Sequence, residues 1–413
     1  MVVTDINEHD NVSTTTPYNP YSGLRIDHQP TSLVAIVEGL TMIIIFLGSL
    51  IINLIALVAI LRDKKLRRNV HNWLIINLII NDLGITITSM FFSIISVFDH
   101  GYILVHSDIL CLINGAGGTG FSFGNFATVL AISLDRFLSV VLPSRFPPSK
   151  TRIIIYIVFC WVVPIANIIP PSFELISDFK YHPFTHHCSP IWQACLYYII
   201  CVIILFGITV PVMVFCYIGV FWTLRRQQQV LRSYTKGRAD DPDDDSLDNA
   251  GETDDSLQVT NPTTNTGLSL DDLPSREGKV SETVEESSTS NLDRHGICKF
   301  DEGNSNQEKI DKKMMKQRSK RRSLQKKLTT DKRIAMTGTL LVMTTVVCWA
   351  PYCIVHSCFI PIHVTHSLGV FTMWLAYINS LLDPIIYSFM NRRVRARYHA
   401  MMSSFRMTVC KKK

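Results

Sequence analysis

The run LVAIVEGLTMIIIFLGSLIINLIALVAIL, residues 33–61, decides the fold of this chain, and Glu38 is the only ionised residue in it. A helix rises about 1.5 Å per residue, so a run of this length crosses the roughly 30 Å hydrocarbon core of a bilayer. Only helices and closed β-barrels satisfy their backbone polar groups there. Because a barrel strand needs about 10 alternating residues, this continuous run predicts a transmembrane helix.

Six further apolar runs predict a helical membrane protein. They occupy residues 72–98, 109–142, 153–176, 191–224, 334–362 and 368–390. Only 18% of all residues are charged, whereas a soluble domain usually carries about 25%. The mean hydropathy of +0.21 also argues against a soluble or wholly disordered chain. We therefore predict an all-α membrane protein, a seven-transmembrane helix bundle.

The Lys and Arg residues of the short loops predict the orientation of this bundle. Basic residues follow the odd-numbered runs, at 62–68, at Arg145, Lys150 and Arg152, and at 392–397 and 411–413. The other loops carry mostly His and Asp, with Lys180 as the lone Lys. Because positive loops favour the cytoplasmic side, we expect an extracellular N-terminus and a cytoplasmic C-terminus in the plasma membrane. Asn11 opens an Asn-Val-Ser glycosylation sequon on the expected outer side.

Composition divides the chain into five regions. They are an extracellular N-terminus (1–31), the first five helices (32–225), a long cytoplasmic loop (226–331), the last two helices (332–390), and a C-terminal region (391–413), whose start the family resemblance given below implies to be a short amphipathic eighth helix. The long loop is acidic at 240–245 and basic at 312–327. Such a composition cannot bury a core, so we predict that this loop and the N-terminus are disordered.

Polar side chains within the predicted spans are costly there and are functional candidates by default. Asp82, Asn125 and Asp383 lie near the centres of the second, third and seventh runs, and Asn53, Asn379 and Ser380 lie at similar depth. Two carboxylates among amide and hydroxyl oxygens suit a Na⁺ ion or a proton. The alternative is an uncharged hydrogen-bond cluster that joins the helices.

Two cysteines fall on the predicted outer side. Cys111 opens the third run, and Cys188 lies in the loop between the fourth and fifth. Because the extracellular side is oxidising, we predict a disulfide that pins this loop across the top of the third helix. On the other side, Cys410 precedes three Lys residues and is a candidate for palmitoylation.

The cytoplasmic end of the third run carries Asp135-Arg136-Phe137, and Asp331 stands at the start of the sixth. Alone this triplet is weak evidence for a functional site, because an Arg at the membrane boundary can simply extend to water. Prolines interrupt the last four runs, at Pro164, Pro211, Pro351 and Pro384. Each can kink its helix, either as a hinge or as a fixed bend.

Taken together and in this order, the motifs resemble those of a rhodopsin-like (class A) G-protein-coupled receptor, over about residues 32–398 without the long loop. The matching positions are Asn53, the run Asn77–Asp82, Cys111 with Cys188, Asp135-Arg136-Phe137, Trp161, Cys348-Trp349-Ala350-Pro351, and Asp383-Pro384-Ile385-Ile386-Tyr387. The resemblance implies a receptor, not an enzyme, that passes an extracellular small-molecule signal to a heterotrimeric G protein by movement of the sixth helix. It also implies arrestin and a receptor kinase as partners, and no nucleic acid.

The resemblance further implies residue roles. Arg136 is held by Asp135 and Asp331 at rest and is released on activation. Trp349 senses the ligand above the kink at Pro351, and Tyr387 swings inward. Asp82, Asn125, Asn379, Ser380 and Asp383 form an allosteric Na⁺ pocket. The chain departs from the family at Thr345, where a Phe is usual, at Tyr217, which lies two residues too close to Pro211, and at Val394, where the eighth helix usually has a Phe.

For the ligand pocket, we expect the outer halves of the third, fifth, sixth and seventh helices. The candidates are Asn114, Gly118, Thr119, Ser122, Trp349, Tyr352, His356, Trp374 and Tyr377, some of which can equally serve helix packing. The chain is similar to the amine, melatonin and opsin branch of the family. However, Gly118 stands at the position of the amine-binding Asp, and Tyr377 stands at that of the retinal Lys, so no Schiff base with retinal can form.

Few fixed charges line this expected pocket, which favours a neutral or weakly polar small molecule. A peptide ligand is the first alternative, and proton sensing by the outer histidines is the second. A seven-helix metallohydrolase would need several His inside the bundle, but only His356 lies clearly within a run. A channel or transporter would show more intramembrane charge or an internal repeat. We expect no cofactor apart from Na⁺.

The basic end of the long loop contains Lys320-Arg321-Arg322-Ser323, which resembles a basophilic kinase site. Phosphorylation of Ser323 would add negative charge beside the expected G-protein contact and weaken it. The alternative is a solvated run of charge near anionic lipid.

Overall fold

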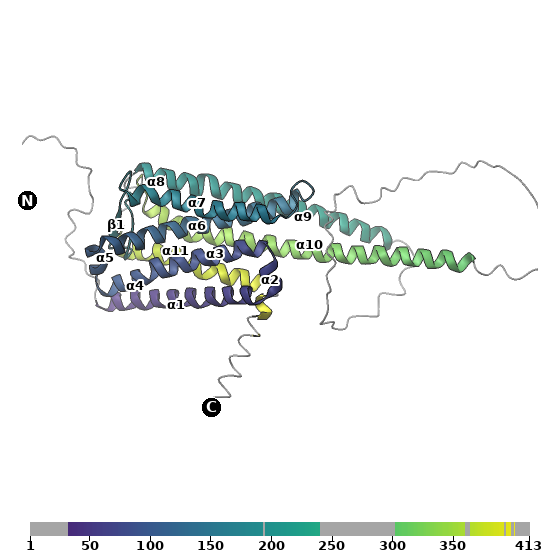
Figure 1. Cartoon of the computed structure of the whole chain (residues 1–413), viewed down its shortest axis with the longest axis horizontal. Helices are drawn as coiled ribbons and strands as arrows, with labels where there is room; N and C mark the ends of the chain where they lie inside the picture. The colour runs from purple at the N-terminus through teal and green to yellow at the C-terminus, as the bar shows by residue number, and fades with distance from the viewer. Residues whose placement is uncertain are drawn as a thin grey trace, which may run out of the picture.

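The computed structural model describes residues 32–192, 195–239, 302–359, 364–391, 394–397 and 400. Within them, seven helical segments are long and apolar enough to cross a membrane, and they pack side by side as one bundle (Figure 1). The predicted fold class is therefore confirmed. The predicted glycosylation site Asn11 and the predicted palmitoylation site Cys410 lie outside the described residues.

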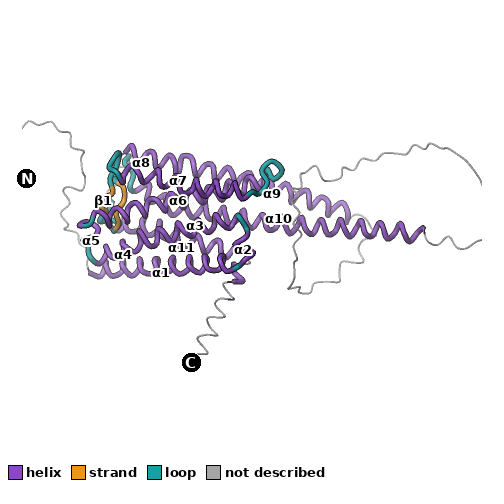
Figure 2. The backbone as a smooth tube through the Cα atoms, viewed as in Figure 1, coloured by secondary structure: helices purple, strands orange, loops and turns teal. Residues whose placement is uncertain are grey.

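Helices and strands follow one another in a simple order. The elements are α1 Ser32–Arg62, α2 Lys64–Arg68, α3 His71–Ile85, η1 Thr86–Met90, α4 Phe91–Phe98, α5 Tyr102–His106, α6 Asp108–Val141, α7 Lys150–Ser172, β1 Phe179–His182, β2 His187–Pro190, α8 Cys195–Val202, η2 Ile203–Thr209, α9 Val210–Ala239, α10 Glu302–Val355 and α11 His366–Met390. Among the described residues, strands occur only at one end of the bundle, as Figure 2 shows.

The second and fifth spans are each interrupted by a π-helical segment. In the second span η1 joins α3 to α4, and in the fifth η2 joins α8 to α9. Pro211 is the second residue of α9, so its missing N–H falls directly after η2, where the helical hydrogen-bond pattern already changes. Such segments often lie at functional sites, and both of these border the cavity described below.

At the end of the bundle opposite the strands, α9 and α10 extend beyond the other helices, and α10 projects furthest (Figure 1). The prediction of a disordered loop over 226–331 is therefore wrong for residues 226–239 and 302–331, which are helical. These stretches are rich in Gln, Lys, Arg, Met and Leu, which are good helix formers. Because each continues a helix that already exists, it avoids the unfavourable nucleation step. Ser323 lies exposed on this part of α10.

Of the predicted eighth helix and tail, the structure describes residues 391, 394–397 and 400, of which 394–397 and 400 are helical. Val394 is fully buried against the largest apolar core cluster of the bundle, so a small apolar residue fills the place where the family usually has Phe. Arg397 Nε donates to Asp63 Oδ2 over 2.9 Å and ties this segment to the turn before α2.

Candidate functional site

Four basic and acidic side chains meet near the C-terminal end of α6. The carboxylate of Asp135, only 1% exposed, accepts from the adjacent Arg136. It also lies 2.8 Å from Arg152 Nη2 on α7 and 2.7 Å from His71 Nδ1 on α3. One buried carboxylate thus joins three helices. Burying its charge would be costly without these partners.

The second predicted partner of Arg136 is not in contact with it. Among the described residues no ion pair joins Arg136 to Asp331, which corrects the expectation of a two-carboxylate clamp. Asp331 attracts Arg136 only at longer range, and Lys327, one turn earlier on α10, attracts Asp331 more strongly. The guanidinium of Arg136 is instead held within its own helix by Asp135.

In the middle of the bundle, the five residues predicted for a Na⁺ pocket lie together and are almost completely buried. Asn125 connects the two acids, because its Nδ2 lies 2.9 Å from Asp82 Oδ1 and 3.0 Å from Asp383 Oδ2. Asn379 Nδ2 also donates to Asp383, over 3.2 Å. The structure therefore places the five side chains as one cluster between α3, α6 and α11.

Several buried oxygens of this cluster and of the neighbouring Asn53 lack a hydrogen-bond partner among the described residues. They are Asn53 Oδ1, Asp82 Oδ2, Asn125 Oδ1, Asn379 Oδ1, Ser380 Oγ and Asp383 Oδ1. An unsatisfied buried polar atom costs about 1–3 kcal/mol. A hard cation takes oxygen ligands of this kind, so the donor set fits Na⁺.

Below this cluster, Tyr387 on α11 is tied to α3. Its Oη donates to Asn72 Oδ1 over 3.3 Å and accepts from Asn391 Nδ2 over 3.0 Å. Tyr217 is buried next to Gly338 of α10, and its hydroxyl has no partner among the described residues. Because a Cβ at residue 338 would collide with that hydroxyl, glycine there allows α9 and α10 to approach.

Above the cluster lies a cavity of about 60 Å³, with a lining that is mostly apolar. The lining residues are Ile85, Ser89, Gly118, Thr119, Ser122, Phe123, Phe126, His187, Ser189, Trp192, Leu205, Trp349, Tyr352, Cys353, Met373 and Tyr377. Six of the nine predicted ligand-site residues are among them. The volume is well below the roughly 300 Å³ of pockets for drug-sized ligands, so in this conformation the cavity holds only a very small molecule.

Of the other three candidates, Asn114 has a structural role. Its Nδ2 donates to the carbonyls of Thr88 and Ser89, at 3.0 and 3.3 Å, and its Oδ1 accepts from the backbone of Cys188 at 2.6 Å. His356 lies beside a smaller neighbouring cavity and stacks on Tyr352. Trp374 packs with Tyr352 and Tyr377 in an apolar cluster.

The loop residues His187, Ser189 and Trp192 form part of the cavity wall, which we call the roof. Trp192 Nε1 donates to Tyr352 Oη over 3.1 Å, and that hydroxyl lies 3.5 Å from Ser189 Oγ. On the opposite wall, Tyr377 Oη lies 2.9 Å from both Ser89 Oγ and Ser93 Oγ. Sequence reasoning missed Ser189, Trp192 and His187, because the fold of a loop over a distant site leaves no periodic signal. Their position just beside Cys188 was the only available hint.

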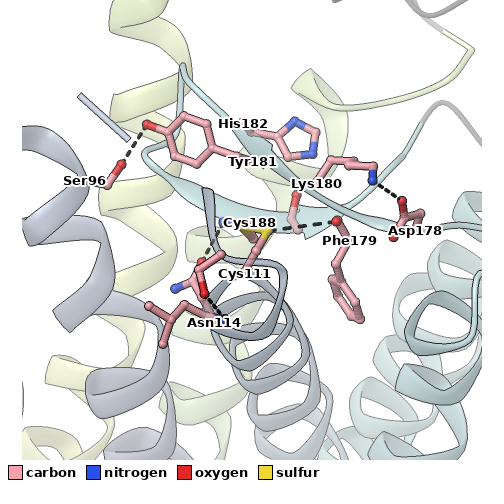
Figure 3. The surroundings of a disulfide bond; sticks show 12 residues. Ser96, Cys111, Asn114, Asp178, Phe179, Lys180, Tyr181, His182 and Cys188 are labelled. Atoms are coloured by element: carbon pink, nitrogen blue, oxygen red, sulfur yellow. Dashed lines mark hydrogen bonds and ion pairs between the residues drawn. A yellow bond between two sulfur atoms is a disulfide. The ribbon is translucent and has the colours of Figure 1, made fainter. Parts of the chain in front are cut away.

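Strands β1 and β2 form the antiparallel hairpin that carries this roof, with Tyr181 opposite Cys188. The predicted disulfide between Cys111 and Cys188 is present and fastens the hairpin to α6. Figure 3 shows Tyr181 beside the disulfide, with its hydroxyl 2.7 Å from Ser96 Oγ. The hairpin is therefore attached to both the second and third spans.

Two histidines of the hairpin are buried and electrically neutral at physiological pH. Burial, followed by repulsion from His356, lowers the pKa of His182 to about 4. Burial, followed by repulsion from His182, lowers the pKa of His187 to about 3. Since His187 stays uncharged, it brings no fixed charge to the cavity.

We expect the Tyr352→Phe substitution to destabilise the closed roof. It leaves the partly buried Trp192 N–H without its acceptor, and an unsatisfied buried donor costs about 1–3 kcal/mol at full burial. Thermal unfolding of the purified protein should show a lower midpoint. Tyr102→Phe, at an exposed residue of α5, is the control and should leave the midpoint unchanged. Equal midpoints for both variants would contradict the proposed role of the Tyr352 hydroxyl.

Comparison with known proteins agrees with this architecture. The model of the family "7 transmembrane receptor (rhodopsin family)" matches residues 52–387. Octopamine receptor beta-2R of Drosophila melanogaster is 23% identical over 89% of this chain and 61% of its own length. Melatonin receptor type 1C of Xenopus laevis is 26% identical over 47% of this chain and 44% of its own.

The fold also matches a solved structure. The crystal structure of squid rhodopsin superposes with a TM-score of 0.66 at 18% identity, over 94% of this chain and 92% of that one. The chain spans about three fifths of the length of the octopamine receptor and of 5-hydroxytryptamine receptor 1 of Drosophila melanogaster, which is 25% identical over 82% of this chain and 59% of its own length.

Proposed function

We propose that this chain, which belongs to the rhodopsin family of seven-transmembrane receptors, passes an extracellular small-molecule signal to a heterotrimeric G protein. The family comprises receptors rather than enzymes, and the chain is a multi-pass membrane protein. The observation that carries the proposal is the arrangement of three layers along one bundle. A roofed cavity, a buried polar cluster and a charged cluster follow one another along α3 and α6, which contribute to all three.

In the proposed mechanism, occupancy of the cavity is passed down α10 and α11. Trp349 forms part of the cavity wall and packs edge-on against Phe126, with ring centres 6.3 Å apart. A ligand that displaces Trp349 would shift α10 about Pro351. Outward movement of the cytoplasmic end of α10 would then expose Arg136 to the G protein, a two-state rearrangement of packed helices.

The proposed ligand is neutral or weakly polar. The cavity wall offers hydroxyl groups and aromatic rings but no ionised side chain among the described residues. The relatives named above include octopamine and melatonin receptors. Gly118, at the family position of the amine-binding Asp, leaves little room for a carboxylate, because an added Cβ would lie 2.9 Å from Ser89 Oγ. A non-cationic ligand therefore suits this cavity better than an amine.

The two alternative ligands fit less well. The cavity of about 60 Å³ disfavours a peptide ligand, which needs much more room. Proton sensing would need groups that titrate near neutral pH, and His182 and His187, whose pKa values lie far below that range, do not supply them. By analogy with the family, we also propose that arrestin and a receptor kinase act on the cytoplasmic side and that the N-terminus is extracellular.

The function is tested by measuring the activation of each Gα class in cells that express the full chain, with Arg136→Ala as the inactive control. The wild type should activate at least one class above the control, either spontaneously or with one member of a library of neutral small molecules. If no class responds under either condition while the protein reaches the cell surface, G-protein coupling is excluded.

We also propose that the polar cluster binds Na⁺ as an allosteric ion. Asp82→Asn keeps the size of the side chain and removes one of the two buried carboxyl groups. Because ligand binding to the native state stabilises it, Na⁺ should raise the unfolding midpoint of the wild type relative to choline by a few degrees. The variant should show no difference between the two salts. A full Na⁺ response in Asp82→Asn would remove the site assignment.

A further inference from the structure

A separate cluster of ligating side chains lies at the extracellular end of the bundle, away from the cavity. It consists of Glu38 on α1, His186 in the turn of the β1–β2 hairpin, and His366, the first residue of α11. Their ligating atoms all lie within 4.8 Å of one another. Three segments far apart in the sequence thus present one oxygen and two nitrogen donors to a common point.

The distances within this cluster suit a small transition-metal ion. His366 Nε2 lies 2.9 and 3.1 Å from the two oxygens of Glu38, and His186 Nε2 lies 3.4 Å from Glu38 Oε2. Zn²⁺ binds His nitrogen and carboxylate oxygen at about 2.0–2.1 Å, so the ligands of a tetrahedral site lie roughly 3.3 Å apart. The donors therefore need only small shifts to surround one ion.

Burial provides an independent observation. Glu38 and His186 are each only 6% exposed, and neither ring nitrogen of His186 has a hydrogen-bond partner among the described residues. The hydrogen bond from His366 satisfies Glu38, whereas the buried imidazole of His186 has only the 3.4 Å ion-pair contact with Glu38 Oε2. A metal ion would serve all three side chains at once and would neutralise the buried carboxylate.

We propose that Glu38, His186 and His366 form an extracellular Zn²⁺ site with a fourth position open to water. Two imidazoles and one carboxylate are a known ligand set for zinc with one open position. Imidazole nitrogen favours Zn²⁺ over the hard ions Mg²⁺ and Ca²⁺. Binding requires neutral histidines and an ionised carboxylate, so it displaces the proton shared by Glu38 and His366.

Such a site would fasten the roof of the cavity to α1 and α11. The hairpin turn already rests on α11 at Gly369, where an added Cβ would lie 2.5 Å from the Phe184 carbonyl oxygen. His187 and Ser189, which follow His186, line the cavity, and Cys188 between them is bonded to α6. Extracellular Zn²⁺ would therefore stabilise the closed roof and restrict the exchange of ligands.

The test is direct Zn²⁺ binding to the purified full chain without a polyhistidine tag, by equilibrium dialysis, with Mg²⁺ as the comparison ion. We expect one tight Zn²⁺ per chain and no comparable binding of Mg²⁺. Glu38→Gln, His186→Ala and His366→Ala should each weaken that binding about 10-fold or more, since even outer partners of metal ligands contribute this much. The control His106→Ala, at an exposed histidine of α5, should bind as the wild type does.

Thermal unfolding in EDTA and in Zn²⁺ separates lost ligation from lost folding. All variants should unfold at similar temperatures in EDTA, and only the wild type and His106→Ala should be stabilised by Zn²⁺. Absence of tight Zn²⁺ binding by the folded wild type, or unchanged binding by all three cluster variants, would overturn the proposal. If the cluster instead confers pH-dependent stability without binding zinc, its ligand is the proton. This assay needs no signalling, so its outcome is independent of G-protein coupling.

Discussion

Asp135→Asn should raise basal G-protein activation, and we expect one of the largest effects on signalling from this change. The substitution keeps the size of the side chain but removes the only carboxylate that contacts Arg136 among the described residues. It also removes the charge that attracts Arg152 and His71. Couplings of this kind are typically worth about 1–3 kcal/mol, or roughly 5- to 150-fold in an equilibrium. Basal activation of the responding Gα class should therefore rise at least about 5-fold per receptor at the cell surface.

Two further variants give this experiment its contrast. Asp135→Glu retains the charge and should stay near the wild-type level. Asp331→Ala should have a much smaller effect than Asp135→Asn, because Asp331 forms no ion pair with Arg136. If Asp331→Ala raises basal signalling as much as Asp135→Asn does, a clamp between α6 and α10 forms in the resting receptor, and the arrangement around Asp135 is not what restrains it.

The sequence was sufficient for features that depend on composition or on local order. Runs of about 20 apolar residues predict spans without any knowledge of packing, and all seven are present. The pairing of Cys111 with Cys188 was also predictable, because the predicted topology places both cysteines on the same oxidising side. The convergence of Asp82, Asn125 and Asp383 depended only on their similar depth in neighbouring helices.

Features that depend on side-chain direction could not be predicted in this way. His71 and Arg152 belong to segments that the sequence marks only as basic loop ends, yet both contact Asp135. Conversely, Asn114 was placed in the ligand pocket because of its position, whereas its amide group is used entirely by the backbone of η1 and of the hairpin. The meeting of Glu38, His186 and His366 likewise requires the path of the hairpin turn.

Loss of the Cys111–Cys188 disulfide should have the largest effect on stability. The bond closes a loop with a sequence separation of 77 residues, and removing a native disulfide typically costs about 2–5 kcal/mol. Its loss also detaches from α6 the hairpin that roofs the cavity. Figure 3 shows Cys188 of the hairpin next to Cys111. Cys111→Ala with Cys188→Ala should therefore strongly reduce the amount of folded receptor at the cell surface and lower its unfolding midpoint. Cys195→Ala, at a free cysteine of α8, should change neither quantity.

The two single variants distinguish loss of the bond from loss of packing. Cys111 and Cys188 are both buried in a small apolar cluster with Leu104, so each substitution also removes some contact area. If the bond dominates, either single change already breaks it, and the double variant should be hardly less stable than each single one. If packing dominates, the two losses should add. Additive losses, together with no change in the wild type under reducing conditions, would show that the hairpin is held by Asn114 and Ser96 without help from the disulfide.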